Sequence, residues 1–150
     1  MEADASSPFA RLNKNWLGDF SSKLEHQGHE VTVTFEAETK EELEELLPTA
    51  EQFWRDRDNW FKTFHDHVVA KFLKKLNDRK PDEETKDLSK TELSDCVAVP
   101  FAVNFYFDDT AKCCAFSVSA GNTKVMFEYV VQAHATLKKG FKNWELVSLI

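Results

Sequence analysis

Glycine is scarce in this chain, which contains four glycines in 150 residues. None of the motifs G-x-G-x-x-G, G-x-x-x-x-G-K-[ST] or G-x-S-x-G is present. These motifs need glycine because the backbone turns sharply or approaches the bound group closely. We therefore expect neither a glycine-rich phosphate-binding loop nor a serine hydrolase of that type.

Cysteine is also scarce, with three residues, of which Cys113 and Cys114 are adjacent. A disulfide framework normally has an even, spaced set of cysteines, so a reducing compartment is expected. No apolar run approaches the roughly 18 residues of a membrane span. The first residues are acidic and polar, unlike a signal peptide, which is basic and then apolar. We expect a cytoplasmic protein.

Basic residues are too few for a nucleic-acid-binding protein. Lys and Arg number 19 against 26 Asp and Glu, which gives a net charge of −7. The densest basic segments, "KFLKK" and "TLKKGFK", are outweighed by acidic ones, so we expect no nucleic-acid partner. An acidic surface favours solubility or a basic protein partner.

Apolar residues at helical spacing predict two central helices, at about 39–56 and 58–77. Thr39 and Glu42 form a T-x-x-E capping box at the start of the first helix. Pro48 cannot donate a backbone hydrogen bond, so a kink or restart is expected there. Ser89 and Glu92 repeat the capping-box spacing and predict a short helix near 90–95.

Four of the five histidines lie in pairs close in sequence, which raises the question of a metal site. His65 and His67 point about 200° apart on a helix with ~3.6 residues per turn, so they cannot share one ion. His26 and His29 flank a glycine-containing turn, but no third ligand lies near them in sequence. We therefore expect no metal and no cofactor.

Alternating apolar and polar residues predict strands in the segments 16–24, 29–37, 101–107, 113–121 and 126–137 and at the C-terminus. Because strands and helices do not alternate, the fold class is α+β. We predict an antiparallel sheet of about six strands, built from hairpins and packed against the helices. We expect one domain spanning 1–150, with 1–14 flexible and 78–88 an exposed acidic loop.

Several short motifs recur in one bacterial family. They are a W-x-G hairpin (Trp16-Leu17-Gly18), L-P-x-A followed by an aromatic (Leu47 to Ala50, then Trp54) and N-D near the end of the second helix (Asn77-Asp78). With the capped short helix and the strands that follow, this order resembles domain of unknown function 2262 over most of residues 15–150. The family has no established activity, so the resemblance implies a fold and no function.

The chain departs from that family in the penultimate strand. A Gly-His pair is common there after an aromatic residue, whereas Glu128-Tyr129 follows Phe127 in this chain. The tryptophan that often follows N-D is also missing. If those residues form a site in the relatives, we expect that site to be altered here.

The absence of catalytic motifs favours a protein that binds a partner rather than an enzyme. One form of this hypothesis is an immunity protein that neutralises a basic toxin domain by stoichiometric binding, because opposite charges accelerate association. The expected partner-binding residues are acidic: Glu41, Glu42, Glu45, Asp82, Glu83 and Glu84.

Two alternatives stay open. One is a small-ligand-binding or regulatory domain with a pocket between sheet and helices. The other is an enzyme whose site is assembled from scattered residues, for example His134, Tyr129 and Glu128, although alternation puts His134 and Tyr129 on opposite faces of a strand. A cysteine–histidine pair could also meet in space, but adjacent strand cysteines point in opposite directions, and one is expected to be buried. A pocket with converging polar groups would favour these alternatives.

Overall fold

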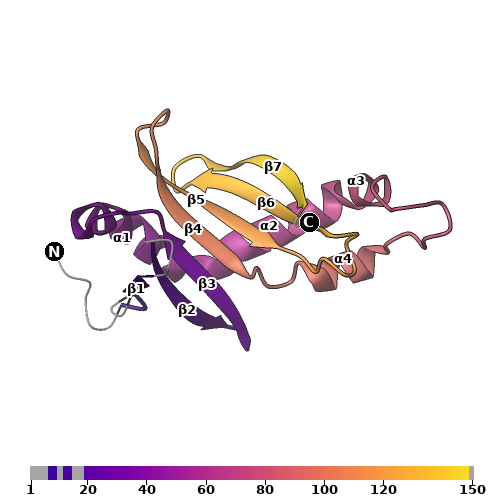
Figure 1. Ribbon diagram of the computed structural model, residues 1–150, viewed down its shortest axis with the longest axis horizontal. Coiled ribbons are helices and arrows are strands. Elements are labelled where there is room, and N and C mark those ends of the chain that lie inside the picture. The colour runs from indigo at the N-terminus through magenta and orange to yellow at the C-terminus, as the bar shows by residue number, and fades with distance from the viewer. Residues whose placement is uncertain (1–6, 10–11, 15–18, 149–150) are drawn as a thin grey trace.

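The computed structural model describes residues 7–9, 12–14 and 19–148, apart from the side chains of Asn13 and Lys14. The expected W-x-G motif at 16–18 lies outside these residues, as does most of the segment 1–14 expected to be flexible. The remaining elements form a sheet covered on one face by helices (Figure 1).

The sheet contains six strands of seven to nine residues and the two-residue strand β1 (Asn13–Lys14). Their order in the sheet follows the chain. The six longer strands are β2 (Phe20–His26), β3 (His29–Phe35), β4 (Ala102–Asp108), β5 (Cys113–Ala120), β6 (Tyr129–Thr136) and β7 (Gly140–Ser148). The predicted α+β class with a hairpin-built sheet is confirmed.

One pair of strands departs from the predicted antiparallel arrangement. β3 and β4 are parallel, with Val33 opposite Val103 and Phe35 opposite Phe105. The helices between them carry the chain back to the end of the sheet where β3 began, which a parallel connection requires. All other neighbouring pairs of described strands are antiparallel.

The helices are α1 (Lys40–Arg55), α2 (Arg57–Lys71), α3 (Leu73–Asn77) and α4 (Lys90–Cys96). The two central helices and the short capped helix are therefore confirmed, but the second central helix divides at Phe72. Of the kink or restart predicted at Pro48, the restart is wrong, because α1 continues through this residue. Pro48 is exposed while Leu46, Leu47 and Ala50 are buried, so packing against the sheet holds the helix together despite one missing hydrogen bond.

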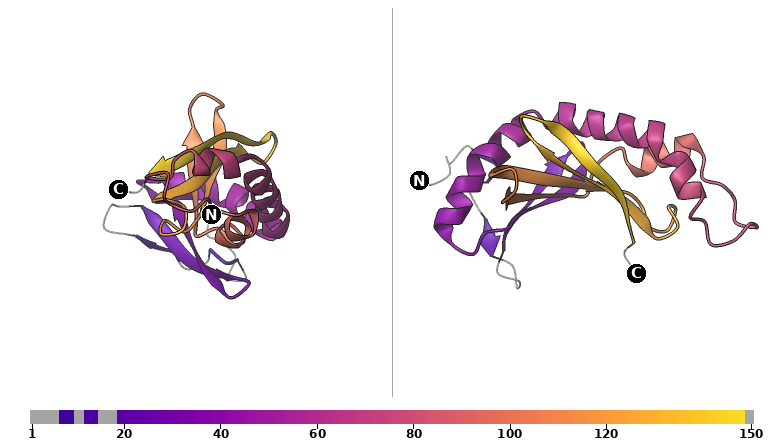
Figure 2. Two further views of the ribbon diagram at one scale, coloured as in Figure 1. Left: turned by 90° about the vertical axis from the view of Figure 1, so that its right-hand side faces the viewer. Right: turned by 90° about the horizontal axis from the view of Figure 1, so that it is seen from above.

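The covered face of the sheet is filled with aromatic rings. Phe53 of α1 is fully buried, and its ring lies 4.6 Å from that of Phe116 and 5.6 Å from that of Phe105. Edge-to-face pairs of this kind stabilise by about 0.5–1.5 kcal/mol beyond their area of burial. Figure 2 shows α1 and α2 running as a bent pair along this face.

The opposite face of the sheet is polar, because its residues alternate with the core residues. One row across neighbouring strands contains Thr34, Asn104, Ser117 and His134, each paired with the next. Ser117 is 4% exposed, and the side-chain oxygen of Asn104 is buried with no hydrogen-bond partner among the described residues. Polar groups are therefore buried on this face as well, although no described helix packs over it.

A long, mostly exposed loop at 78–89 joins α3 to α4. Its two ends are joined by Asn77, whose side-chain amide donates to the carbonyl of Leu88 at 3.1 Å and whose oxygen accepts the Leu88 N–H at 2.7 Å. These two hydrogen bonds hold the two ends of the loop close together.

Among the described residues, no helix is both long and apolar enough to cross a membrane.

Candidate functional site

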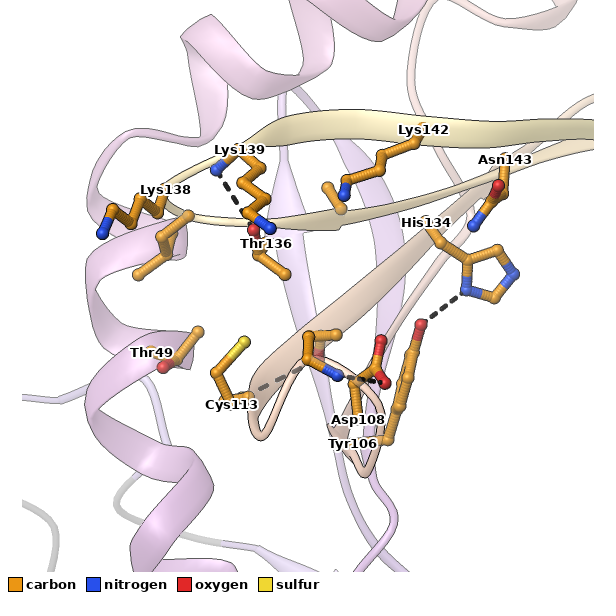
Figure 3. Close-up of a pocket in the computed structure, with 15 residues that line it drawn as sticks. Thr49, Tyr106, Asp108, Cys113, His134, Thr136, Lys138, Lys139, Lys142 and Asn143 are labelled. Carbon is orange, nitrogen blue, oxygen red and sulfur yellow. Dashed lines mark hydrogen bonds between the residues drawn. The ribbon is translucent and has the colours of Figure 1, made fainter.

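A cavity of about 480 Å³ opens at one end of the sheet, between the β4–β5 and β6–β7 hairpins (Figure 3). This volume lies in the range of pockets that hold small organic molecules, roughly 300–1,000 Å³. Strand ends and hairpin turns supply nearly all of its walls, and α1 contributes Thr49. The polar or reactive lining residues are Thr49, Tyr106, Asp108, Cys113, Cys114, His134, Thr136, Lys138, Lys139, Lys142 and Asn143.

One wall carries a chain of polar groups on the open face of the sheet. The hydroxyl of Tyr106 lies 2.7 Å from Nδ1 of His134 (Figure 3), and Nε2 of His134 lies 3.6 Å from a carboxylate oxygen of Glu145. The carboxylate favours a proton on Nε2, so Nδ1 accepts the hydrogen bond and Tyr106 donates it. The Tyr106 oxygen then keeps lone pairs that can accept a further hydrogen bond.

Burial raises the pKa of Tyr106 above its usual value, with smaller contributions from the nearby carboxylates of Asp108 and Glu36. Tyr106 is therefore a neutral hydroxyl at physiological pH, suited to hydrogen bonding.

A β-bulge in β7 shapes this wall. His134 pairs with Lys142 and Gln132 pairs with Glu145, so two residues of β7 oppose one residue of β6. Asn143, with a φ of 57°, supplies the left-handed conformation that the bulge needs. Without the bulge, Lys142 and Glu145 would alternate to opposite faces. With it, both lie beside His134, while Trp144 stays on the helix side.

Three lysines border the cavity on the β6–β7 hairpin: Lys138, Lys139 and Lys142. All three are exposed, and none takes part in a salt bridge within the described part of the chain. In Figure 3, the side chains of Lys139 and Lys142 extend from the hairpin towards the cavity, whereas Lys138 extends towards the side of α1.

Other polar groups of the cavity already have local partners. One carboxylate oxygen of Asp108 accepts the backbone N–H groups of Thr110 and Ala111, which fixes the β4–β5 turn. The hydroxyl of Thr136 accepts the backbone N–H of Lys139 at 3.1 Å and fixes the β6–β7 turn. Both turns are therefore held by residues that also line the cavity, which keeps its shape defined before a ligand binds.

The two adjacent cysteines point in opposite directions, as predicted. Cys113 faces the open side of the sheet, and Cys114 faces α1, where Thr49 lies. Burial raises the pKa of the Cys114 thiol to about 11, so it is protonated at neutral pH. A thiol in this state is a poor nucleophile and behaves as a small apolar side chain.

The acidic residues expected to bind a partner fall into two separate groups. Glu41, Glu42 and Glu45 are exposed on the first two turns of α1, and Asp82, Glu83 and Glu84 are exposed in the 78–89 loop. Figure 1 shows these segments at opposite ends of the long axis. One compact partner would therefore contact one group, not both.

Two of these acids also have local roles. The carboxylate of Glu42 accepts the backbone N–H of Glu38 at 2.9 Å, and that of Asp82 accepts both the N–H and the hydroxyl of Thr85. The hydrogen bond from the Thr85 side chain is the main cause of the lowered pKa of Asp82. Glu41 and Glu45 have no such bond among the described residues.

The histidines predicted not to share a metal have different partners. Nε2 of His65 lies 2.8 Å from the hydroxyl of Ser94 on α4, while the ring of His67 stacks on Trp144 at 3.7 Å. His67 is thus half-buried against β7. In the described segments, no group of three or more His, Cys, Asp or Glu residues could hold a metal ion.

His26 and His29, which flank the first hairpin turn, also lie in different environments. His29 is exposed, whereas His26 is 5% exposed and its Nδ1 accepts a hydrogen bond from Nε of Arg57 at 3.0 Å. Burial and the adjacent Arg57 charge lower the pKa of His26. His26 is therefore a neutral core residue that links the first hairpin to α2.

Of His134, Tyr129 and Glu128, which were considered together from the sequence, His134 alone lines the cavity. Tyr129 and His134 lie on opposite faces of β6, as alternation requires, and the guanidinium of Arg79 lies over the Tyr129 ring at 5.5 Å. The partners of His134 are instead Tyr106 and Glu145, from the two other strands of the site. Tyr106 lies on the same polar face of β4 as Asn104, and the pairing of β4, β5 and β6 brings it to His134.

No family model matches the chain, and no match is found among curated proteins or among solved structures. The resemblance to domain of unknown function 2262 stays a prediction.

Proposed function

We propose that this protein is a small-ligand-binding domain whose site is the cavity between the β4–β5 and β6–β7 hairpins. The observation that carries the proposal is the convergence of Tyr106, His134 and the hairpin lysines on one cavity of about 480 Å³. Pockets of this size with a few converging polar groups are typical of small-molecule sites.

The local backbone supports this assignment. The bulge at Asn143 brings Lys142 and Glu145 to the same face beside His134. Bulges are common next to functional sites, where they redirect a side chain. A bulge that served only to twist the edge strand would not explain why the redirected Lys142 borders the cavity and the redirected Glu145 lies beside His134, which lines it.

We assign this site to binding rather than to catalysis. Tyr106 is a neutral hydroxyl that donates to His134, and the Cys114 thiol is protonated at neutral pH. The Cys114 thiol is not activated as a nucleophile, because its pKa is raised rather than lowered. Tyr106 has an adjacent base in His134, but burial raises the pKa of its hydroxyl, which favours the neutral, hydrogen-bonding form. The groups present supply hydrogen bonds and positive charge, which are the means of recognition.

A thermal-shift screen with a library of metabolites at millimolar concentration tests the proposal. Binding at 100 times Kd stabilises by about 2.7 kcal/mol, and for a chain of this length each kcal/mol raises Tm by roughly 2–4 °C. We expect at least one compound to raise the Tm of the wild-type protein by several degrees. The same compound should have little effect on His134→Asn.

His29→Asn is the matched control, because His29 is exposed in the first hairpin, outside the cavity. The Tm of each variant without compound shows that it is folded. The proposal fails if no compound raises the wild-type Tm, or if every active compound stabilises His134→Asn equally.

A second candidate is a small cytoplasmic protein-binding module, such as an immunity protein, with α1 as its contact surface. Glu41 and Glu45 lie one turn apart on α1, both are exposed, and neither forms a salt bridge within the described residues. Phe107, at the end of β4, is 51% exposed and adds an apolar contact. Acidic and aromatic groups together suit a basic protein partner.

Affinity capture at low salt, with mass spectrometry of the bound protein, tests this candidate. We expect one basic partner at equal stoichiometry, released as the salt concentration rises and lost with Glu41→Gln/Glu45→Gln. Retention of the partner by that double variant would exclude α1 as the contact surface.

A further inference from the structure

We propose that the ligand of the cavity is a small organic anion, bound through a phosphate or carboxylate group by Lys139 and Lys142. This inference rests on the proposed function and specifies the chemical class of the ligand. It is carried by the distribution of charge around the cavity, by the directions of the two lysine side chains and by the hydrogen-bonding groups opposite them.

The charge of the cavity is opposite to that of the whole chain. The protein carries a net charge of −7, yet this cavity is bordered by three lysines and lined by one carboxylate, that of Asp108. Asp108 already accepts two backbone N–H groups of the β4–β5 turn, which partly neutralise its charge locally. The cavity is therefore a cationic site in an acidic protein.

The lysines are available to a ligand. No carboxylate among the described residues forms a salt bridge with Lys138, Lys139 or Lys142. Several other lysines are paired, for example Lys62 with Asp66 at 2.6 Å and Lys80 with Asp87 at 2.7 Å. Three adjacent cations without counter-ions repel one another, and a bound anion would relieve that repulsion.

The backbone sets the direction of two of these lysines. Lys142 precedes the bulge at Asn143 and pairs with His134, so it projects from the open face next to the Tyr106–His134 pair. Lys139 follows the turn whose geometry the Thr136 hydroxyl fixes. Figure 3 shows both side chains directed towards the cavity. Lys138 points towards α1, so its contribution is the long-range attraction of its charge.

The site has two chemically different parts. The β6–β7 hairpin supplies ammonium groups, which form charge-assisted hydrogen bonds to anionic oxygens. The strand wall supplies the Tyr106 oxygen and the Asn143 amide, which suit neutral hydroxyl or amide groups. The ligand therefore carries its anionic group at the hairpin and polar, uncharged groups towards Tyr106. Inorganic phosphate alone would leave the second part unused.

Glucose 6-phosphate, gluconate and glucose form a matched set of probes, because they share a six-carbon polyol or sugar skeleton and carry a phosphate, a carboxylate and no charge. Isothermal titration at low salt measures their affinities for the full chain. We expect at least one acidic probe to bind about tenfold more tightly than glucose, because a charged hydrogen bond is stronger than a neutral one. The acidic probe that binds more tightly identifies the anionic group, and its affinity should fall as salt screens the charges.

The variant Lys139→Gln/Lys142→Gln should weaken binding of the acidic probe by about tenfold or more, for the same reason. Lys71→Gln/Lys90→Gln is the matched control, because it removes the same charge from exposed positions on α2 and α4, outside the cavity. The control should bind like the wild type. Equal losses in both variants would show a general charge effect and overturn the assignment to these lysines.

The inference and the proposed function fail in different ways. The anionic class is wrong if glucose binds as tightly as both acidic probes. It is also wrong if the compounds found in the thermal-shift screen are neutral and bind Lys139→Gln/Lys142→Gln as tightly as the wild type. In both cases the binding function stands. If neither the probes nor any screened compound binds, both fail.

Discussion

The two faces of the sheet come from the same strands, yet they are organised by different forces. On the helix side, Val103, Phe105 and Phe116 are buried against the rings of α1 and α2. On the other side, the intervening residues Asn104, Tyr106 and Ser117 form a polar surface that ends in the cavity. Packing fixes the first face, whereas hydrogen bonds and charge shape the second. Stability is therefore expected to depend on the first face and binding on the second.

The strongest test of this division is Phe53→Ala on the helix side. Phe53 is fully buried, with four aromatic rings around it: Trp60, Phe61, Phe105 and Phe116. Replacing a buried Phe with Ala typically lowers the free energy of unfolding by about 3–5 kcal/mol. Chemical denaturation measures the loss. A decrease below about 1 kcal/mol would show that the aromatic cluster does not hold the two layers together.

A smaller loss is expected for Tyr106→Phe on the polar face. The change removes the 2.7 Å hydrogen bond to His134 and keeps the ring, so we expect about 0.5–1.5 kcal/mol. Tyr129→Phe is the matched control, because the Tyr129 hydroxyl accepts one long bond of 3.4 Å from Arg79. Chemical denaturation of both variants measures the difference between their free energies of unfolding. A larger loss for Tyr129→Phe would contradict the role given to the Tyr106–His134 pair.

The helix side also predicts how stability depends on pH. Burial is the main cause of the lowered pKa values of His26 and His67, with further lowering of His26 by Arg57. As pH falls through the unfolded-state pKa of about 6.5, the unfolded chain takes up protons that the folded protein resists. The free energy of unfolding should therefore decrease between pH 7 and pH 5.

Denaturation of His26→Gln over the same pH range is the check on this assignment. The variant should show a shallower decrease, with the remaining slope due in part to His67. If the wild-type stability is constant or rises as pH falls from 7 to 5, the assignment of these histidines as neutral buried groups is wrong.

The smallest effect is expected at Asn104, in the middle of the polar face. Its side-chain oxygen is buried with no hydrogen-bond partner among the described residues, so removing the amide should cost little. Asn104→Thr also introduces a β-branched residue into a strand, where such residues are favoured. We expect a change of stability within about 0.5 kcal/mol, measured by thermal unfolding. A loss above about 1 kcal/mol would show that the amide is used.

The sequence predicted the elements well because their signals are local. Alternation located the strands, helical spacing located α1 and α2, and the Ser89–Glu92 capping box located α4. The restart predicted at Pro48 does not occur, because the local penalty of the proline is smaller than the stabilisation from burial of Leu46, Leu47 and Ala50 around it. The parallel pairing of β3 with β4 could not be predicted, because it depends on how the intervening helices cross the sheet.

The candidate site was harder to predict, since it is assembled from residues distant in sequence. His134 was considered, but with Tyr129 and Glu128, its neighbours along the chain. Its true partners, Tyr106 and Glu145, meet it through strand register and through the bulge at Asn143. The nearest local signal is Asn143 itself, since asparagine tolerates the left-handed conformation more readily than most residues. The lysines were noted only as a basic segment too small to bind nucleic acid.

The central claim is that the polar end of the sheet binds a small ligand. Two-dimensional ¹H–¹⁵N NMR of the full chain, titrated with the most stabilising compound from the thermal-shift screen, tests it most directly. We predict saturable chemical-shift changes concentrated in residues 106–115 and 134–145, with little change in α3, α4 and the loop between them. Changes concentrated on the first turns of α1, or spread evenly over the protein, would contradict the claim.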